Sequence, residues 1–209
     1  KPMFTNSIEL SQKTTFKKGY LYTALYHRFA DGTITRLSVT VPGSKVIYAI
    51  FQNVNKSYNT GVELIFSQTP VKWYTYTLNL NAYRNQIDAF TVVNKYPELN
   101  TFSAAQQEMI SGNAKLNNIL KLKRQFDLQI SLMYLAPDII PQGKIAARFS
   151  LDLGLKKSVK KGKGEWFLNA TDLLNTMVIR KDITGQGFTY ISTDYYETQV
   201  VRLGYSQKF

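Results

Sequence analysis

The sequence predicts an all-β fold made of long antiparallel strands. Three observations support this fold class: apolar and polar residues alternate with a period of two, residue types that favour strands are frequent, and short turns alternate with long connections. The last fifteen residues show the alternation most clearly. One side of that segment carries Val201, Leu203, Tyr205 and Phe209, and the other side carries Thr198, Arg202, Ser206 and Lys208. A strand of this kind separates two different surroundings.

Length and composition fit a single domain over residues 1–209. The chain is 44% hydrophobic and 19% charged, which is too apolar for a disordered protein. No run reaches the roughly 18 to 20 apolar residues of a spanning helix, whereas a spanning strand needs only about ten residues. The absence of cysteine excludes a disulfide scaffold, a thiol nucleophile and Cys-ligated metal. Residues 1–4 lack the apolar core of a signal peptide, so we expect that the signal peptide is absent from this chain.

The net charge of +12 raises the question of a nucleic-acid partner. The basic residues concentrate in short turns, at residues 17–18, 72, 121–124, 156–157 and 160–163. A nucleic-acid site needs a basic surface interleaved with stacking aromatics, or a recognisable reading element, and the sequence has neither. We therefore expect no nucleic acid, and basic turns that are either solvated or face anionic headgroups.

Roughly nine strands are predicted. They cover residues 6–16, 20–29 with a continuation through 33–40, 46–53 and on to 61–67, 73–84, 109–120, 125–135, 147–156, 165–172, and the terminal segment. Residues 103–108 are the one stretch with helical character, within a loop.

The connections between these strands alternate in length. Those near residues 17–19, 68–72, 121–124 and 157–164 are short, and those near 30–58, 85–108, 136–146 and 173–194 are long and polar. Up-and-down transmembrane β-barrels sort their connections in this way, with the long loops outside the cell. The pattern therefore favours an antiparallel up-and-down transmembrane β-barrel segment.

Aromatic residues flank the short turns, as in the interfacial belts of membrane proteins, at Phe16, Tyr20, Trp73, Tyr74, Phe126, Trp166 and Phe209. Along one strand, Phe126 and Tyr134 end an apolar face and stand about 20 Å apart along the membrane normal, close to the ~25 Å apolar band of such barrels. Residues predicted to face lipid are Phe126, Leu128, Ile130, Leu132, Tyr134, Phe149, Leu151, Leu153, Val201, Leu203, Tyr205 and Phe209. Residues predicted to line the lumen are Asn79, Asn81, Asp127, Gln129, Asp152 and Arg202.

Two questions stay open at this point. In the second strand, Tyr20, Tyr22 and Tyr26 compete with Leu21, Leu25 and Phe29 for the outer face. Alternation also fits a soluble β-barrel or sandwich with its apolar side inward. The alternative function is therefore a soluble β-rich module that binds carbohydrate or protein.

Four segments carry a family resemblance. KPMFTNSIEL (residues 1–10), NKSYNTGVEL (55–64), NATDLLNT (169–176) and VRLGYSQKF (201–209) resemble the C-terminal barrel portion of TonB-dependent outer-membrane receptors, in the form of the Bacteroidetes-type outer membrane protein β-barrel family. The resemblance covers essentially the whole chain. One departure is Gln207, where the family commonly has an aromatic residue.

The resemblance implies a larger barrel of 22 strands in the outer membrane of Gram-negative bacteria, filled by a plug and energised by TonB. It implies import of a scarce nutrient: an iron chelate, a vitamin, a glycan or a peptide. Residues 1–209 would be the C-terminal part of that barrel, with the plug absent from this chain. Expected partners are outer-membrane lipid and lipopolysaccharide, the rest of the barrel and plug, TonB through the missing N-terminal part, and the nutrient.

No catalytic constellation is expected. His27 is the single histidine, and sequence places no serine and acid beside it. Asp127 and Asp152 lie on adjacent predicted strands with the same orientation. We interpret them as lumen-lining residues rather than as an acid/base pair. We expect no enzyme activity, no cofactor and no metal.

If residues 1–209 contact a ligand, we expect the contacts in the long loops, because loops on a rigid scaffold commonly carry the residues that recognise ligands. The candidates are Asn94, Tyr96, Phe102, Arg180, Tyr190, Asp194 and Tyr195.

Overall fold

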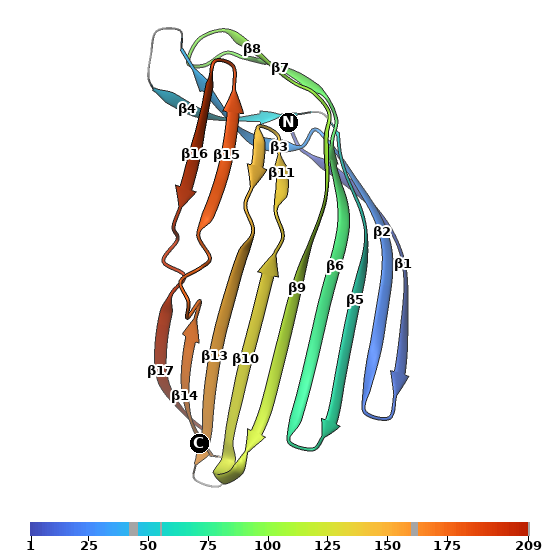
Figure 1. Ribbon diagram of the computed structural model, residues 1–209, viewed down its shortest axis with the longest axis vertical. Helices are drawn as coiled ribbons and strands as arrows, with labels where there is room; N and C mark the ends of the chain where they lie inside the picture. Colours follow the sequence, from blue (N-terminus) through green and yellow to red (C-terminus); the bar gives the residue numbers. More distant parts are fainter. Residues whose placement is uncertain (42–45, 55, 160–162, 209) are drawn as a thin grey trace.

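The computed structural model describes residues 1–41, 46–54, 56–159 and 163–208. Nine long strands form one sheet, in the order β1 (Phe4–Phe16), β2 (Gly19–Asp31), β5 (Ser57–Val71), β6 (Tyr74–Ile87), β9 (Gln107–Leu122), β10 (Phe126–Leu135), β13 (Arg148–Val159), β14 (Gly164–Thr171) and β17 (Val200–Gln207). Every neighbouring pair is antiparallel, so the chain meanders up and down across the sheet (Figure 1). The prediction of an antiparallel all-β fold is confirmed.

The connections of this sheet are sorted by length, as predicted. Residues 17–18, residues 72–73 and the 3-10 turn η1 (Lys123–Gln125) join strands at the end that lies at the bottom of Figure 1. The fourth predicted short turn contains residues 160–162, which lie outside the described residues. Residues 32–56, 88–106, 136–147 and 172–199 connect strands at the opposite end. All four long connections contain strands of their own.

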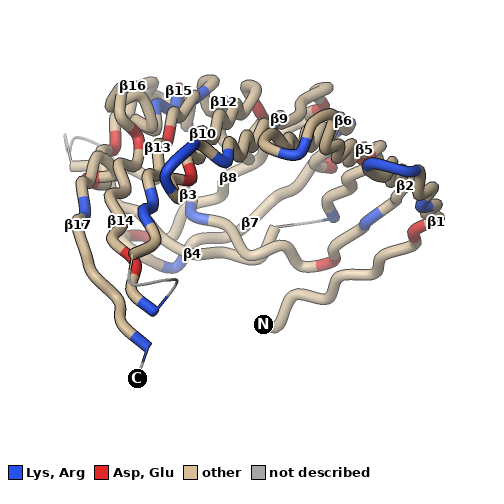
Figure 2. The backbone as a smooth tube through the Cα atoms, turned by 90° about the horizontal axis from the view of Figure 1, so that it is seen from below, with Lys and Arg blue, Asp and Glu red and all other residues tan. Residues whose placement is uncertain are grey.

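These shorter strands form what we call the loop layer. It consists of the hairpin β3 (Ile34–Thr40) with β4 (Ile47–Asn53), the hairpin β7 (Phe90–Asn94) with β8 (Asn100–Ala104), and a sheet of β11 (Asp138–Ile140), β12 (Gly143–Ile145), β15 (Ile179–Gly185) and β16 (Phe188–Asp194). Seen from below, the nine-stranded sheet is an arc, and β3, β4 and β7 lie across its concave side (Figure 2).

Three expectations about these connections were wrong. Residues 33–40 do not continue β2, and residues 46–53 do not continue into β5, because β3 and β4 pair with each other along their whole length. Residues 103–108 are not helical: they include the end of β8 and the start of β9, and both strands find backbone partners in the neighbouring strands β7 and β6. Backbone pairing with the neighbouring strands outweighs local helix propensity in this segment.

The main buried apolar core lies where the loop layer meets the upper end of the nine-stranded sheet. It contains Leu37, Val54, Ile87, Phe90, Phe102 and Ile139, with Ile50, Val92, Ala104 and Met109 packed against it. Ile87 and Met109 belong to the upper ends of β6 and β9, so the core ties the loop layer to the wall beneath it.

The strand register gives the nine-stranded sheet two chemically different faces. One row of register partners runs Leu203, Leu168, Leu155, Leu128, Leu120 and Tyr74, and another runs Leu151, Leu132, Leu116, Leu78, Phe66 and Leu21. We call this side the apolar face. The rows between them are Arg202, Asn169, Gly154 and Gln129, and Asp152, Ser131, Asn117, Thr77 and Ser67. We call that side the polar face.

We predict that Leu37→Ala loosens the loop layer. Leu37 is fully buried in its core, and truncating a buried leucine costs about 2–5 kcal/mol. Hydrogen–deuterium exchange of the purified protein in detergent should show faster exchange in β3, β4, β7 and β8. Leu99→Ala is the matched control, because Leu99 is 78% exposed in the same layer; equal exchange in the two variants contradicts the assignment of this core.

Candidate ligand-binding and membrane-facing sites

The apolar face is uncovered in the described part of the chain. Leu10, Leu25, Ile110 and Leu203 are 75%, 62%, 82% and 71% exposed. Burying one such side chain is worth about 1.5–3 kcal/mol, so ten or more of them outweigh the ~5–15 kcal/mol by which a whole domain is stable. An apolar medium outside the chain must therefore cover this face.

Aromatic side chains edge the apolar face at the end with the short turns. Phe16 packs on Phe66 with ring centroids 6.0 Å apart, Phe66 on Tyr76 at 5.8 Å, and Trp166 on Tyr205 at 4.8 Å. Lys157 Nζ lies 4.5 Å from the Phe126 ring centre. Tyr20, expected in this belt, points to the polar face instead and carries Lys13 over its ring. We call the remaining set, Phe16, Phe66, Trp73, Tyr74, Tyr76, Phe126, Trp166 and Tyr205, the lower aromatic belt.

A second aromatic group marks the other end of the apolar face. The His27 ring contacts the rings of Phe29 and Tyr58, with centroids 6.2 Å away in each case, and its Nδ1 is 2.7 Å from the Thr60 hydroxyl. On the same face, Arg84 forms an ion pair with Glu108. Charged and aromatic residues thus end the leucine-rich band at this side, as they do where a membrane interface begins.

The register separates the two predicted sets of wall residues. Asn79, Asn81, Asp127, Gln129, Asp152 and Arg202 all lie on the polar face. The residues predicted to face lipid all lie on the apolar face, apart from Phe209, which is outside the described residues. The register also orients β2: its tyrosines share the polar face, where Tyr26 donates to Asn81 Oδ1 at 2.9 Å and Tyr22 donates to Glu9 at 2.9 Å.

Part of the polar face is hollowed. A depression of about 270 Å³ lies over Lys115, Asn117, Gln129, Ser131, Asp152, Asn169 and Arg202. These side chains come from β9, β10, β13, β14 and β17, and they place a lysine and an arginine among amides, hydroxyls and the Asp152 carboxylate. A surface with this mixture of donors and acceptors suits water and polar solutes.

The loop layer holds a more enclosed pocket of about 240 Å³. We call it the loop pocket; Thr35, Arg36, Ser38, Ile140, Pro141, Gln142, Lys181, Ile183, Tyr190, Ser192 and Asp194 line it. Three separate long connections contribute, and Gln142 joins them. Its side chain accepts from Ser38 N at 2.6 Å and donates to Ser38 O at 2.9 Å, while its carbonyl accepts from Thr184 N. Ser38 Oγ is 2.8 Å from the Tyr190 hydroxyl.

The charged groups of the loop pocket are two cations and one carboxylate. Lys181 Nζ donates to Asp194 at 2.9 Å, and Ser192 Oγ donates to the same carboxylate at 3.2 Å. The hydrogen bond from Lys181 lowers the pKa of Asp194 below its ordinary value, and Arg36 contributes electrostatically. Arg36 has no hydrogen bond to another described residue, so its guanidinium is available to a ligand.

The structure distributes the seven predicted ligand contacts over the loop layer. Tyr190 and Asp194 line the loop pocket. Tyr96, Tyr195 and Arg180 are exposed elsewhere, with Tyr96 set edge-on against Tyr48 at 5.7 Å.

Asn94 and Phe102 differ from the expectation, because both are buried. Asn94 is fully buried and bonds to Gln52 and Asn100, and Phe102 belongs to the apolar core. Sequence reasoning missed Arg36, Ser38, Gln142 and Lys181, which become neighbours only when three loops meet.

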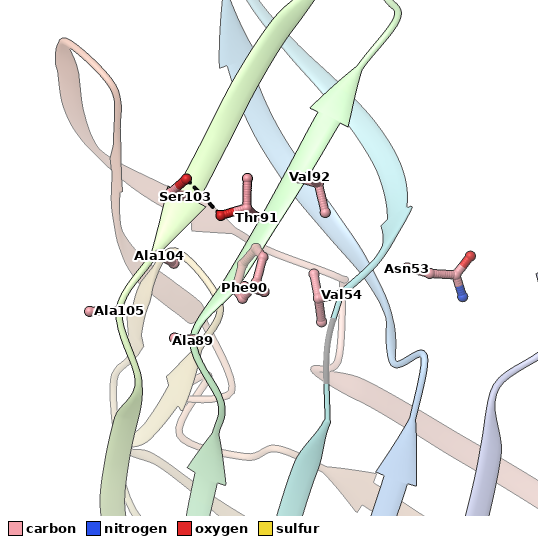
Figure 3. A pocket seen from close by; sticks show the side chains of 9 residues that line it. All are labelled: Asn53, Val54, Ala89, Phe90, Thr91, Val92, Ser103, Ala104 and Ala105. Carbon is pink, nitrogen blue, oxygen red and sulfur yellow. Dashed lines mark hydrogen bonds between the residues drawn. The ribbon is translucent and has the colours of Figure 1, made fainter.

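A second hollow in the loop layer has a different character. It is an open crevice beside the base of β7 and β8, and Figure 3 shows the side chains that line it. They are Asn53, Val54, Phe90, Val92, three alanines, and the hydrogen-bonded pair Thr91 and Ser103. None of these side chains ionises, so a charged group finds its partners in the loop pocket and not in this crevice.

The carboxylates of the wall have structural partners. Asp127 lies 3.4 Å from Lys156 Nζ, while Asp152 accepts from Ser150 Oγ and from Asp172 N, both at 2.8 Å. Asp172 is 2% exposed and accepts from Thr176 N, Met177 N and Thr198 Oγ1. The hydrogen bonds of Asp172 therefore hold the segment that follows β14 against the segment that precedes β17. Within the described ranges, no three His, Asp or Glu side chains gather as a metal site would need.

Comparison with known proteins agrees with this geometry. The outer membrane protein beta-barrel family matches residues 1–206. This chain belongs to that family. Its members lie in the bacterial outer membrane, which supplies the apolar medium that the apolar face requires. Neither the curated proteins nor the solved structures contain a significant match. No helix in the described segments is long and apolar enough to cross a membrane.

We predict that the β15–β16 hairpin loosens in acid. Because the folded-state pKa of Asp194 lies below its unfolded value, the contribution of its bond to Lys181 is fully present above the unfolded pKa and is lost as the pH falls through the folded pKa. Protease cleavage within residues 179–194 should therefore rise as the pH falls below about 4. In Asp194→Asn the cleavage rate should already be raised at neutral pH and should change less with acid. A pH profile identical to that of the unsubstituted protein rules out the Asp194 contact as the cause.

Proposed function

We propose that this chain forms part of the wall of a TonB-dependent transporter that imports a scarce nutrient across the outer membrane. The observation that carries the proposal is that the nine-stranded sheet has two chemically different faces and bears the loop layer at one of its ends. An apolar face suits lipid, a polar face suits an aqueous passage, and a loop layer with a polar pocket stands at the entrance to that passage.

The curvature of the sheet supports a passage on the polar side. The loop layer reaches the polar face, where Asp138 of β11 accepts from Tyr83 Oη and from Asn85 Nδ2, both at 2.8 Å. Tyr83 and Asn85 belong to the polar face of β6. Ile87 of the same face belongs to one core cluster with Leu37 of β3, and β3 lies on the concave side of the arc (Figure 2). The concave side is thus the wet side, as in a barrel with a hydrated lumen.

The edges of the sheet support membership of a larger barrel. β1 and β17 end the nine-stranded order, and every residue of β1 is exposed. Backbone groups without partners cost several kcal/mol each in hydrocarbon, so a sheet in lipid requires further strands along both edges. A barrel of 22 strands, as the family resemblance implies, supplies them, and its plug and TonB complete the transporter.

The loop pocket is the proposed recognition site for the nutrient. It offers the free guanidinium of Arg36, the Lys181–Asp194 pair and the Tyr190 hydroxyl within one enclosed space. At about 240 Å³ it is smaller than the ~300–1,000 Å³ of pockets for drug-sized ligands. We therefore propose that it holds one group of a larger nutrient. The role of the chain is transport, with no chemistry of its own.

A pair of adjacent substitutions tests the lipid-facing assignment. Ile130→Arg should cost about 2–4 kcal/mol if Ile130 faces the bilayer core, because a cation loses its water there. Gln129→Arg places the same charge on the exposed polar face one residue away and should assemble normally. The measurement is the amount of each variant in outer-membrane fractions that shows heat-modifiable gel migration. Equal assembly of the two variants overturns the assignment of the faces.

Uptake measurements test the import function. A strain that lacks the gene should lose growth on one limiting nutrient when iron chelates, vitamins, glycans and peptides are supplied singly. A protonophore should abolish uptake of that nutrient by the parent strain, since TonB draws energy from the inner membrane. Tyr190→Phe combined with Arg36→Gln should lower affinity for that nutrient about tenfold, through the loss of about 1.5 kcal/mol of polar contacts. Growth on every nutrient without the gene counts against import.

The alternative of a soluble β-rich binding module predicts an opposite behaviour in solution. Such a protein stays monodisperse in buffer without detergent. The family membership and the uncovered apolar face both favour a protein that requires detergent.

A further inference from the structure

Basic residues gather at the end of the wall that carries the short turns. The antiparallel meander brings three described turns, the facing ends of β13 and β14 and the end of β17 to one end of the sheet, so cations far apart in sequence form one surface. We call this surface the basic rim: Lys17, Lys18, Lys72, Lys121, Lys123, Arg124, Lys156, Lys157, Lys163 and Lys208. In the view from below, these blue segments follow the arc of the wall (Figure 2).

The basic rim is only weakly neutralised by the protein. Asp127 and Glu165 are the acidic residues among the described strand ends beside it, and both lie near Lys156, at 3.4 Å and 3.8 Å. Lys18 donates to the carbonyl of Pro70 at 2.6 Å, which leaves its charge uncompensated. Lys17, Lys72 and Lys123 are exposed and form no ion pair with described residues. A dense positive surface of this kind attracts a multivalent or concentrated anion.

The opposite end of the wall does not share this imbalance. There, carboxylates are about as frequent as cations, and some of them form ion pairs, as in Arg84 with Glu108 and Lys181 with Asp194. Further acids of the loop end are Asp31, Asp88, Glu98, Asp138, Asp182 and Glu197. The positive charge is therefore a property of one membrane interface and not of the whole chain.

The lower aromatic belt fixes the depth of the basic rim in the membrane. Trp166 with Tyr205 and Phe16 with Phe66 edge the apolar face directly above the turns. Tryptophan and tyrosine rings settle at the level of the headgroups, and lysine stems run along apolar surface to place their ammonium groups there. Lys157, which lies over the Phe126 ring, already shows this placement. The cations of the rim thus stand where lipid phosphates are.

We propose that the basic rim binds the headgroups of anionic phospholipids in the periplasmic leaflet. The short turns of outer-membrane barrels lie on the periplasmic side, and anionic leaflets attract clustered lysines within about 10 Å. Such lipids compensate the rim's charge and hold the wall at a defined height. The inference is independent of the nutrient and of the loop pocket.

Tryptophan fluorescence gives a local test. The chain has two tryptophans, and both, Trp73 and Trp166, lie beside the basic rim. The complete barrel, with tryptophans outside residues 1–209 replaced by phenylalanine, is reconstituted into phosphatidylcholine vesicles with 20% phosphatidylglycerol. Bromine labels are carried either by the phosphatidylglycerol or by an equal fraction of the phosphatidylcholine. Brominated phosphatidylglycerol should quench about twofold more strongly, and 0.5 M salt should reduce the difference. Equal quenching by the two labelled lipids overturns the proposal.

Matched variants assign the effect to named residues. The triple variant Lys17→Gln, Lys72→Gln and Lys123→Gln removes rim charges whose side chains make no contact that folding needs. It should lose at least half of the preference for phosphatidylglycerol. The control variant Lys56→Gln, Lys95→Gln and Lys144→Gln removes the same charge from the loop end and should keep the preference. A preference that persists in the rim variant, or disappears equally in the control, contradicts a rim site. The lipid comparison on the unsubstituted protein decides the question even where a variant fails to insert.

Discussion

The constraint on which this structure depends is that a nine-stranded sheet in lipid must satisfy its backbone within itself while turning an apolar surface outward. The antiparallel meander meets the first requirement between β1 and β17, because each inner strand has hydrogen-bonded neighbours on both sides. The period of two meets the second requirement, because register aligns leucine with leucine across strand after strand. Burial inside the protein contributes little to the wall. The main apolar core lies in the loop layer and at the upper ends of β6 and β9.

The same constraint explains where polar groups are found. On the concave side, tyrosines and amides bond to one another, as Tyr26 does to Asn81 and Ser131 does to Asn117. At the loop end, Asp138 ties β11 to Tyr83 and Asn85, and Gln142 ties β3 to the turn between β11 and β12. These bonds cross between segments far apart in sequence. They give the loop layer a defined shape, and the loop pocket exists because of that shape.

The sequence predicted the wall well and the loop layer poorly. Alternation along residues 126–134 and 149–155 assigned each side chain to a face, because successive side chains of a strand point to opposite faces of the sheet. The same reasoning could not assign the faces of β2, because tyrosine occurs on both apolar and polar faces. Only the register with β5 showed which face each β2 side chain occupies. Asn94 and Phe102 were predicted as exposed contacts because loops are usually solvated, yet the β7–β8 hairpin folds back and buries both.

Sequence alone determined the strand meander, the sorting of short and long connections, the division into two faces and the basic character of the turns. Each of these follows from periodicity, turn chemistry or charge that acts within a few residues. Tertiary structure alone decided which loops meet, that Arg36 and Tyr190 share a pocket with Lys181 and Asp194, and that the cations at the described strand ends and turns form one rim. The physical reason is that such neighbours depend on pairing across long stretches of chain, and no local pattern encodes that pairing.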